Sequence, residues 1–151
     1  MLTKVTGDLI DMGRCGKLTV IVHGCNCMNT MGAGIAKKLA AMWPEVRQAD
    51  VLTQKGDRNK LGSCSVARIS DTLRVFNAYT QYAYGPAHQK HFDLDALRHA
   101  LGFVRESTTP DDIIGMPLIG AGLGGGLWSD IEPVIAEVLY DRQVIVVLFR
   151  S

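Results

Sequence analysis

Residues 18–40 read LTVIVHGCNCMNTMGAGIAKKLA, and this stretch decides the fold. Its opening run, LTVIV (18–22), is apolar and β-branched, which is typical of a strand buried on both faces of a parallel sheet. From Gly34 to about Trp43 the apolar residues follow a helical spacing, with Lys37 and Lys38 facing outward. A glycine-rich segment therefore joins a buried strand to a helix, as in layered α/β domains.

The rest of the chain repeats this alternation. Further strands are expected at 63–70, 73–81, 112–120 and 143–149, and further helices at 44–56, 93–107 and 129–140. A glycine-rich loop at 121–128 precedes the last helix. The pattern predicts a single α/β domain over residues 1–151, with a largely parallel sheet covered by helices on both faces.

Composition limits the kinds of partner. Sixteen basic and fifteen acidic residues give a formal net charge of +1, so no general attraction to nucleic acid is expected. No signal peptide and no run of membrane-spanning length is evident, which indicates a soluble, cytoplasmic protein without membrane contact. In that reducing compartment the four cysteines are expected to be free thiols that mostly pack as small apolar residues. We expect a monomer.

The segment from His23 to Gly34 has three possible explanations: a metal site, a thiol nucleophile, or a backbone cradle for a phosphorylated ligand. A metal is disfavoured, because Cys25 and Cys27 are one residue apart and no second pair completes a zinc site. Cys27, with His23 nearby and a glycine-rich helix start, leaves the thiol open. The glycines favour the cradle, since free N–H groups at a helix start attract anions, although they also suit a plain tight turn.

A second glycine loop follows the strand expected at 112–120. Gly120, Gly122 and Gly125 satisfy G-x-G-x-x-G, the dinucleotide fingerprint. That fingerprint belongs to an opening βαβ unit whose next strand ends in an acidic residue, whereas here the next strand is the last and ends LFRS. A Rossmann dehydrogenase is therefore disfavoured. Two anion-cradling loops at one sheet edge predict one ligand with a pyrophosphate between them.

Polar residues near the loops are candidate catalytic groups. Asn26 lies at the strand end, where it could fix a hydroxyl or a water. His23 could serve as an acid or base, or be hydrogen-bonded in the core, and strand alternation places it opposite Asn26 unless the chain has already turned.

Two acidic residues also carry alternative interpretations. Asp130 could be a general base, but SDIE (129–132) is also typical of a helix start, with Ser129 or Asp130 as the cap and Glu132 completing a capping box. Asp8, in the dipeptide Gly7–Asp8, could form a turn or accept the amino group of an adenine.

Three motifs together resemble the macrodomain family: GDLI (7–10), HGCNCMNTMGAGIAKKL (23–39) and MPLIGAGLGGGLW (116–128). The resemblance covers nearly the whole chain and implies a three-layer α/β/α fold around a mixed six-stranded sheet that binds ADP-ribose. It is strongest to the branch containing ADP-ribose-1″-phosphate phosphatases and the terminal ADP-ribose protein glycohydrolase, which carries the same MGAGIA pattern.

The resemblance assigns roles to this sequence. Asp8, beside Leu9 and Ile10, would accept the adenine amino group, Asn26 would face the distal ribose, and Phe149 would pack near the adenine or its ribose. The two glycine loops would enclose the diphosphate with Met31, Gly32, Ala33, Gly34, Ile35 and Ala36 on one side and Gly120, Ala121, Gly122, Leu123, Gly124, Gly125, Gly126 and Leu127 on the other. No cofactor and no metal is implied.

Two departures bear on chemistry. The glycohydrolase branch has a lysine after the fourth strand and an aspartate in the second glycine loop, where this chain has Gln81 and Gly124. This argues against removal of ADP-ribose from proteins through a covalent sugar adduct. We expect hydrolysis of ADP-ribose-1″-phosphate, with His23, Asn26 and Asp130 as candidate catalytic residues. The alternatives are a non-catalytic reader of free or protein-linked ADP-ribose, a hydrolase of ADP-ribosyl esters on proteins or acetyl groups, and another nucleotide-binding α/β domain.

Overall fold

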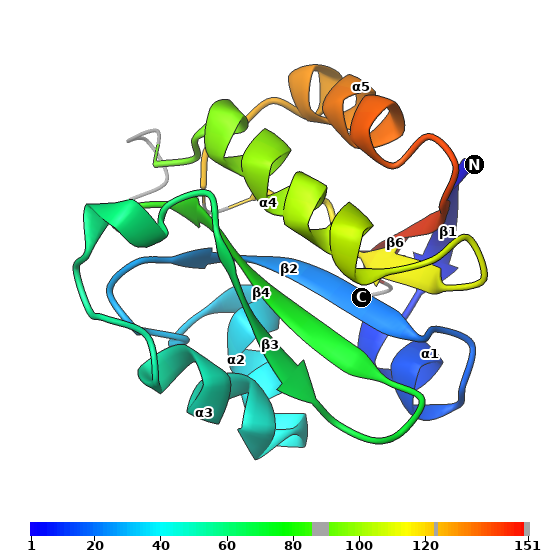
Figure 1. Ribbon diagram of the computed structural model, residues 1–151, viewed down its shortest axis with the longest axis horizontal. Helices are drawn as coiled ribbons and strands as arrows, with labels where there is room; N and C mark the ends of the chain where they lie inside the picture. The colour runs from blue at the N-terminus through cyan, green and yellow to red at the C-terminus, as the bar shows by residue number, and fades with distance from the viewer. Residues whose placement is uncertain (86–90, 123, 150–151) are drawn as a thin grey trace.

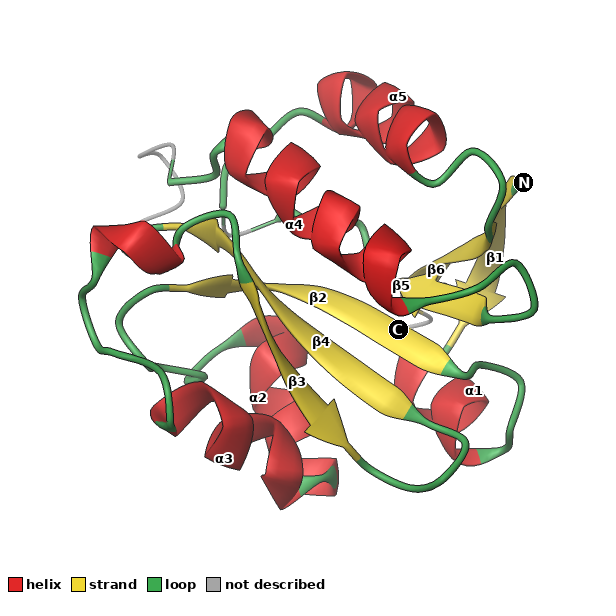
Figure 2. Cartoon of the chain, in the orientation of Figure 1, coloured by secondary structure: helices red, strands yellow, loops and turns green. Residues whose placement is uncertain are grey.

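Six strands form one sheet, in the order β1-β6-β5-β2-β4-β3, in a computed structural model that describes residues 1–85, 91–122 and 124–149 (Figures 1 and 2). The strands are β1 (Leu2–Gly7), β2 (Val20–Asn26), β3 (Cys64–Arg68), β4 (Arg74–Gln81), β5 (Ile113–Met116) and β6 (Gln143–Phe149). Neighbours are parallel except β3 with β4. The predicted mixed, largely parallel sheet is confirmed, and the parallel strands end at one edge.

Helices cover both faces of the sheet (Figure 2). On one face lie α1 (Leu9–Arg14), α2 (Gly34–Met42) and α3 (Pro44–Val51), and on the other lie α4 (Leu94–Ser107) and α5 (Trp128–Val138), with a short 3₁₀ turn at Arg58–Lys60. Two apolar cores result, one under each layer. The three-layer α/β/α arrangement is therefore confirmed. Within the described ranges, the structure contains no helix with the length and apolarity needed to cross a membrane.

The central strand β2 shows why the apolar run predicted two-sided burial. Val20 and Val22 pack into the core under α4 and α5, and Ile21 and Cys25 pack into the core under α1 to α3. Because successive side chains of a strand point to opposite faces, a strand between two helix layers must be apolar on both.

The first strand and helix have no counterpart in the predicted pattern. β1 is an edge strand that pairs only with β6 among the named strands, and its middle residues are exposed. It therefore shows no apolar alternation that could identify it. Asp8 caps α1, accepting hydrogen bonds at Oδ1 from the N–H of Ile10 (2.9 Å) and of Asp11 (3.1 Å). Asp8 thus lies where the chain turns from β1 into α1, as a helix cap, and its role toward an adenine stays a prediction.

The start of α5 corrects a prediction. The helix begins at Trp128 with Leu127 as its N-cap and has no side-chain capping bond, so a capping box at residues 129–132 is wrong. Asp130 lies in the first turn instead, and Glu132 pairs with Lys4 at 3.3 Å across the surface. The pattern misled because acidic residues also suit the first turn of a helix, where they face the positive end of its dipole.

Candidate functional site

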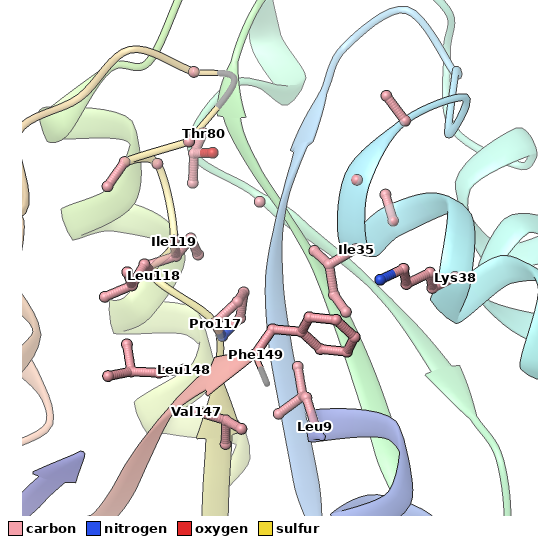
Figure 3. A pocket seen from close by; sticks show the side chains of 18 of the residues that line it. Leu9, Ile35, Lys38, Thr80, Pro117, Leu118, Ile119, Val147, Leu148 and Phe149 are labelled. Atoms are coloured by element: carbon pink, nitrogen blue, oxygen red, sulfur yellow. The ribbon is translucent and has the colours of Figure 1, made fainter. Parts of the chain in front are cut away.

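A cleft opens at the carboxyl ends of the parallel strands, as expected for an open α/β sheet. It consists of two adjoining cavities of about 570 and 500 Å³, each within the size range of ligand pockets. The larger lies above the ends of β5 and β6 (Figure 3), and the smaller is lined by the end of β2 and the loop after it. Both are lined by Gly24, Ala33, Ala36 and Gln81.

The first rim of the cleft is the start of α2. Ala33 is the N-cap and provides no side-chain capping bond, so the first-turn N–H groups have no side-chain acceptor. Gly34 has φ +61°, a backbone conformation that favours glycine. Ala33 to Ala36 line the larger cavity, while Met31 and Gly32 line the smaller one. Backbone donors and small side chains together suit an anionic ligand.

The second rim is the loop after β5. Of its predicted residues, Gly120, Ala121, Gly122 and Gly124 line the larger cavity, and Leu123 lies outside the described residues. The loop is closed by the N–H of Gly126, which donates to the carbonyl of Gly120 at 2.8 Å. Gly125, Gly126 and Leu127 are not part of either cavity lining.

The glycines of this loop have two different reasons to be glycine. A Cβ on Gly120 would lie 2.4 Å from Cε1 of Phe92, and one on Gly126 would lie 2.7 Å from Cδ2 of the same ring. These two glycines are needed for packing. A Cβ on Gly122 would meet nothing within 4 Å, so at this position the absent side chain leaves space in the cleft itself.

One end of the larger cavity is apolar. Leu9, Ile35 and Phe149 point into it, with Lys38 alongside (Figure 3). Phe149 and Gly7 are register partners at the ends of β6 and β1, so the next residue, Asp8, lies near this end of the cavity without lining it. Ile10 also lies outside the cavity lining and packs into the core under α1.

Asn26 lies at the other end, in the lining of the smaller cavity. Its Oδ1 accepts a hydrogen bond from the N–H of Met28 (2.9 Å), and its Nδ2 donates to the hydroxyl of Thr30 (2.9 Å). The side chain therefore shapes the loop that leads to α2. Oδ1 keeps a second lone pair for a ligand or a water.

His23 does not share this position. Its side chain is fully buried in the core under α3, where Nε2 donates to Oδ1 of Asn77 at 2.6 Å. Burial lowers the pKa of His23 from 6.5 to about 4, against the smaller raising effect of the Asn77 hydrogen bond. His23 lines neither cavity, so this placement corresponds to the core interpretation and brings neither ring nitrogen into the cleft.

Asp130 is likewise apart from the cleft. It is exposed in the first turn of α5 and lines neither cavity. The predicted catalytic trio of His23, Asn26 and Asp130 is therefore not brought together, and only Asn26 faces the cleft.

Three of the four thiols are poor nucleophiles in this structure. Burial raises the pKa of Cys25 and of Cys27, and that of Cys64 to about 12, so all three thiols are protonated near neutral pH. Cys25 lines the smaller cavity but is almost fully buried in the core under α2 and α3. Nor do three His, Cys, Asp or Glu side chains converge as a metal site anywhere in the described part of the chain.

A buried polar network supports the loop between Asn26 and α2. Asn29, at φ +57°, accepts a hydrogen bond from the Lys60 ammonium, which also donates to the Thr53 hydroxyl at 2.7 Å. Below it the Tyr79 hydroxyl donates to the buried Asp50 carboxylate at 2.7 Å. The network fixes the backbone just before the residues that line the smaller cavity.

Several lining residues were not predicted as ligand-binding. Lys38 follows the predicted rim by two residues, and Pro117, Leu118 and Ile119 precede the second loop. Gln81 and Gly124 lie side by side, since a Cβ on Gly124 would be 3.0 Å from Oε1 of Gln81. Lys38 and residues 117–119 could have been predicted from the sequence, because they directly follow or precede the glycine loops. Nothing local in the sequence links Gln81 to Gly124.

Comparison with known proteins supports a common family. No family model matches the chain. An uncharacterized 17.5 kDa protein of Enterobacteria phage T4 is 36% identical, over 97% of this chain and 96% of its own length. An ADP-ribose 1″-phosphate phosphatase of Saccharomyces cerevisiae is 26% identical, over 94% and 95%.

Solved structures agree in fold. A Bacteroides thetaiotaomicron protein of unknown function superposes with a TM-score of 0.82 at 26% identity, covering 98% of both chains. A Streptomyces coelicolor macrodomain protein superposes with a TM-score of 0.73 at 24% identity, covering 100% of this chain and 99% of its own. A Thermosipho africanus DarTG in complex with ADP-ribose gives 0.73 at 16% identity, covering 97% of this chain and 41% of its own. The sheet order, the two-rimmed cleft and these relatives lead to one conclusion: the chain belongs to the macrodomain family.

Proposed function

We propose that this protein, as a single macrodomain of residues 1–151, binds ADP-ribose and hydrolyses the terminal phosphate ester of ADP-ribose 1″-phosphate. The observation that carries the binding proposal is the cleft itself. It has an apolar end with an aromatic ring, two rims made of small residues at a helix start and a glycine loop, and a second cavity beyond them. This order matches a base, a diphosphate and a second ribose.

In this pose the adenine lies against Phe149, with the Asp8 carboxylate accepting from its amino group. The diphosphate lies between the start of α2 and the loop around Gly122, and the distal ribose enters the smaller cavity near Asn26. Calorimetric titration with ADP-ribose, with AMP and NAD as controls, tests the proposal. Saturable binding selective for ADP-ribose is expected, and its absence would overturn the roles assigned to residues at both ends of the cleft.

The adenine assignment predicts a specific effect of Asp8→Asn. The new amide keeps Oδ1 as the acceptor for the α1 N–H groups, so the helix cap survives. The substitution replaces the other carboxylate oxygen by an NH₂ group. This group is a donor, so it cannot accept the hydrogen bond that the adenine amino group donates. We expect ADP-ribose affinity to fall about tenfold, the loss of a hydrogen bond to a charged group, with unchanged stability. Unchanged affinity by calorimetry would exclude Asp8 from the adenine site.

The hydrolysis proposal rests on the relatives named as phosphatases and on room for a terminal phosphate near Asn26. In the reaction a water oxygen attacks phosphorus, the bond from phosphorus to the ribose oxygen breaks, and inorganic phosphate and ADP-ribose leave. Asn26 Oδ1 could orient the water, and backbone N–H groups of the second rim could stabilise the phosphoryl oxygens. The leaving oxygen takes its proton from water, because no carboxyl or imidazole group is among the described lining residues.

That same lining favours a second candidate, a reader that binds ADP-ribose and leaves it intact. Phosphate release from ADP-ribose 1″-phosphate separates the two, with Gly122→Val as a control whose cleft is blocked. Release by the wild type well above this control supports the phosphatase. Binding without release supports the reader, and a parallel assay on an ADP-ribosyl ester tests the remaining hydrolase alternative.

A further inference from the structure

Lys38 holds an unusual position in the cleft. It is the one charged residue among the described residues that line the two cavities. Its ammonium lies 3.9 Å from the centroid of the Phe149 ring, and Figure 3 shows the side chain reaching from α2 toward that ring. Phe149 as a residue is 57% exposed, so a ligand can reach it from the cleft.

This contact has a consequence for any base that stacks on the covered face of Phe149. The base must first displace the ammonium and lose a cation–π contact of modest strength at an exposed site. A neutral nucleoside offers the displaced ammonium no new partner. A nucleotide with phosphates does, because Ile35 and Ala36, within one helical turn of Lys38, line the same cavity.

We infer that Lys38 is a selectivity residue of the cleft: its ammonium covers the Phe149 ring in the free protein and yields the ring to a base only when the ligand carries phosphate groups that the ammonium can contact. The inference rests on the proposed function, since it takes Phe149 as the platform for the adenine. The Lys38 ammonium, and not the shape of the cleft, would then select against uncharged nucleosides.

The chain supplies a matched control in Lys37. Both lysines are exposed residues of α2, but Lys37 lies outside both cavity linings. Lys38→Met and Lys37→Met each remove one positive charge and keep an unbranched side chain with good helix propensity. Any difference between them therefore reports the contact with the cleft rather than net charge.

The inference predicts opposite effects on two ligands. In Lys38→Met, adenosine affinity, measured by NMR titration, should rise about two- to fivefold, because no cation–π contact is lost on stacking. ADP-ribose affinity at low salt should fall about three- to tenfold, because a charge contact to phosphate is lost. Lys37→Met should change neither. In a Phe149→Leu background, adding Lys38→Met should leave adenosine affinity unchanged.

The outcomes separate the inference from the function on which it rests. If the wild type binds ADP-ribose and Lys38→Met behaves like Lys37→Met, the inference is wrong and the proposed function stands. The same holds if adenosine and ADP-ribose affinities change in the same direction. If the wild type does not bind ADP-ribose, both fail.

Discussion

Gly122→Val is expected to abolish measurable ADP-ribose binding while the protein stays folded. A Cβ built at this position meets no protein atom within 4 Å apart from its chain neighbours, and Gly122 lines the larger cavity, so we expect the larger valine side chain to enter the cleft. There it occupies the space that lets a diphosphate reach the backbone N–H groups of the second rim. Gly122→Ala should give an intermediate loss of about tenfold, since one methyl group already separates the phosphate from its donors.

Stability measurements decide whether this loss is specific to the cleft. The free energy of unfolding should change by no more than about 0.5 kcal/mol, as for other substitutions without packing contacts. Gly102→Ala is the matched control, because Gly102 on α4 also has no neighbour within 4 Å of a built Cβ and lies away from the cavities. It should bind ADP-ribose like the wild type. Full affinity in Gly122→Val would exclude the second rim from the binding site.

His23 is expected to make the protein lose stability in mild acid. Its pKa is about 4 in the folded protein and 6.5 as the ordinary value, so between these limits the unfolded chain binds a proton that the folded one does not. The stability contribution is therefore complete above pH 6.5 and is lost as the pH falls toward 4. Each pH unit between the two pKa values lowers the free energy of unfolding by about 1.4 kcal/mol, so the whole loss is about 3 kcal/mol.

Urea unfolding at a series of pH values between 7.5 and 4 measures this effect. His23→Gln removes the titrating group, so its free energy of unfolding should depend on pH less steeply by about one proton, even if its stability is lower throughout. An identical slope in His23→Gln and the wild type would contradict the buried, neutral state of His23.

The His23 result also bears on catalysis. As a proton donor to ligand, His23 would have to face the cleft, but it hydrogen-bonds to Asn77 inside the core under α3. If His23→Gln retains phosphate release at neutral pH, its role is confined to packing and stability. The alternation of side chains along β2 already predicted different surroundings for His23 and Asn26, and in the structure His23 is buried in the core while Asn26 lines the smaller cavity.

Sequence by itself determined the elements whose signals are local. The apolar run at 18–22, the helical spacings at 34–43 and 93–107, and the glycines after two strands each depend on neighbours a few residues away. They were sufficient for the layered fold and for two backbone rims at one sheet edge. These local signals were less accurate at the ends of elements. The sequence predicted that a side chain at Ser129 or Asp130 caps α5, whereas the helix begins at Trp128 without a side-chain cap.

Only the tertiary structure decided which distant residues meet. Strand pairing places Phe149 of β6 next to α2 and under Lys38, and the end of β4 meets the second glycine loop, where Gln81 lies beside Gly124. It also reveals β1, an edge strand whose exposed side chains leave no periodic signal. The physical reason is that local periodicity reports which side of an element is buried, whereas the composition of a cleft depends on contacts between residues far apart in the chain.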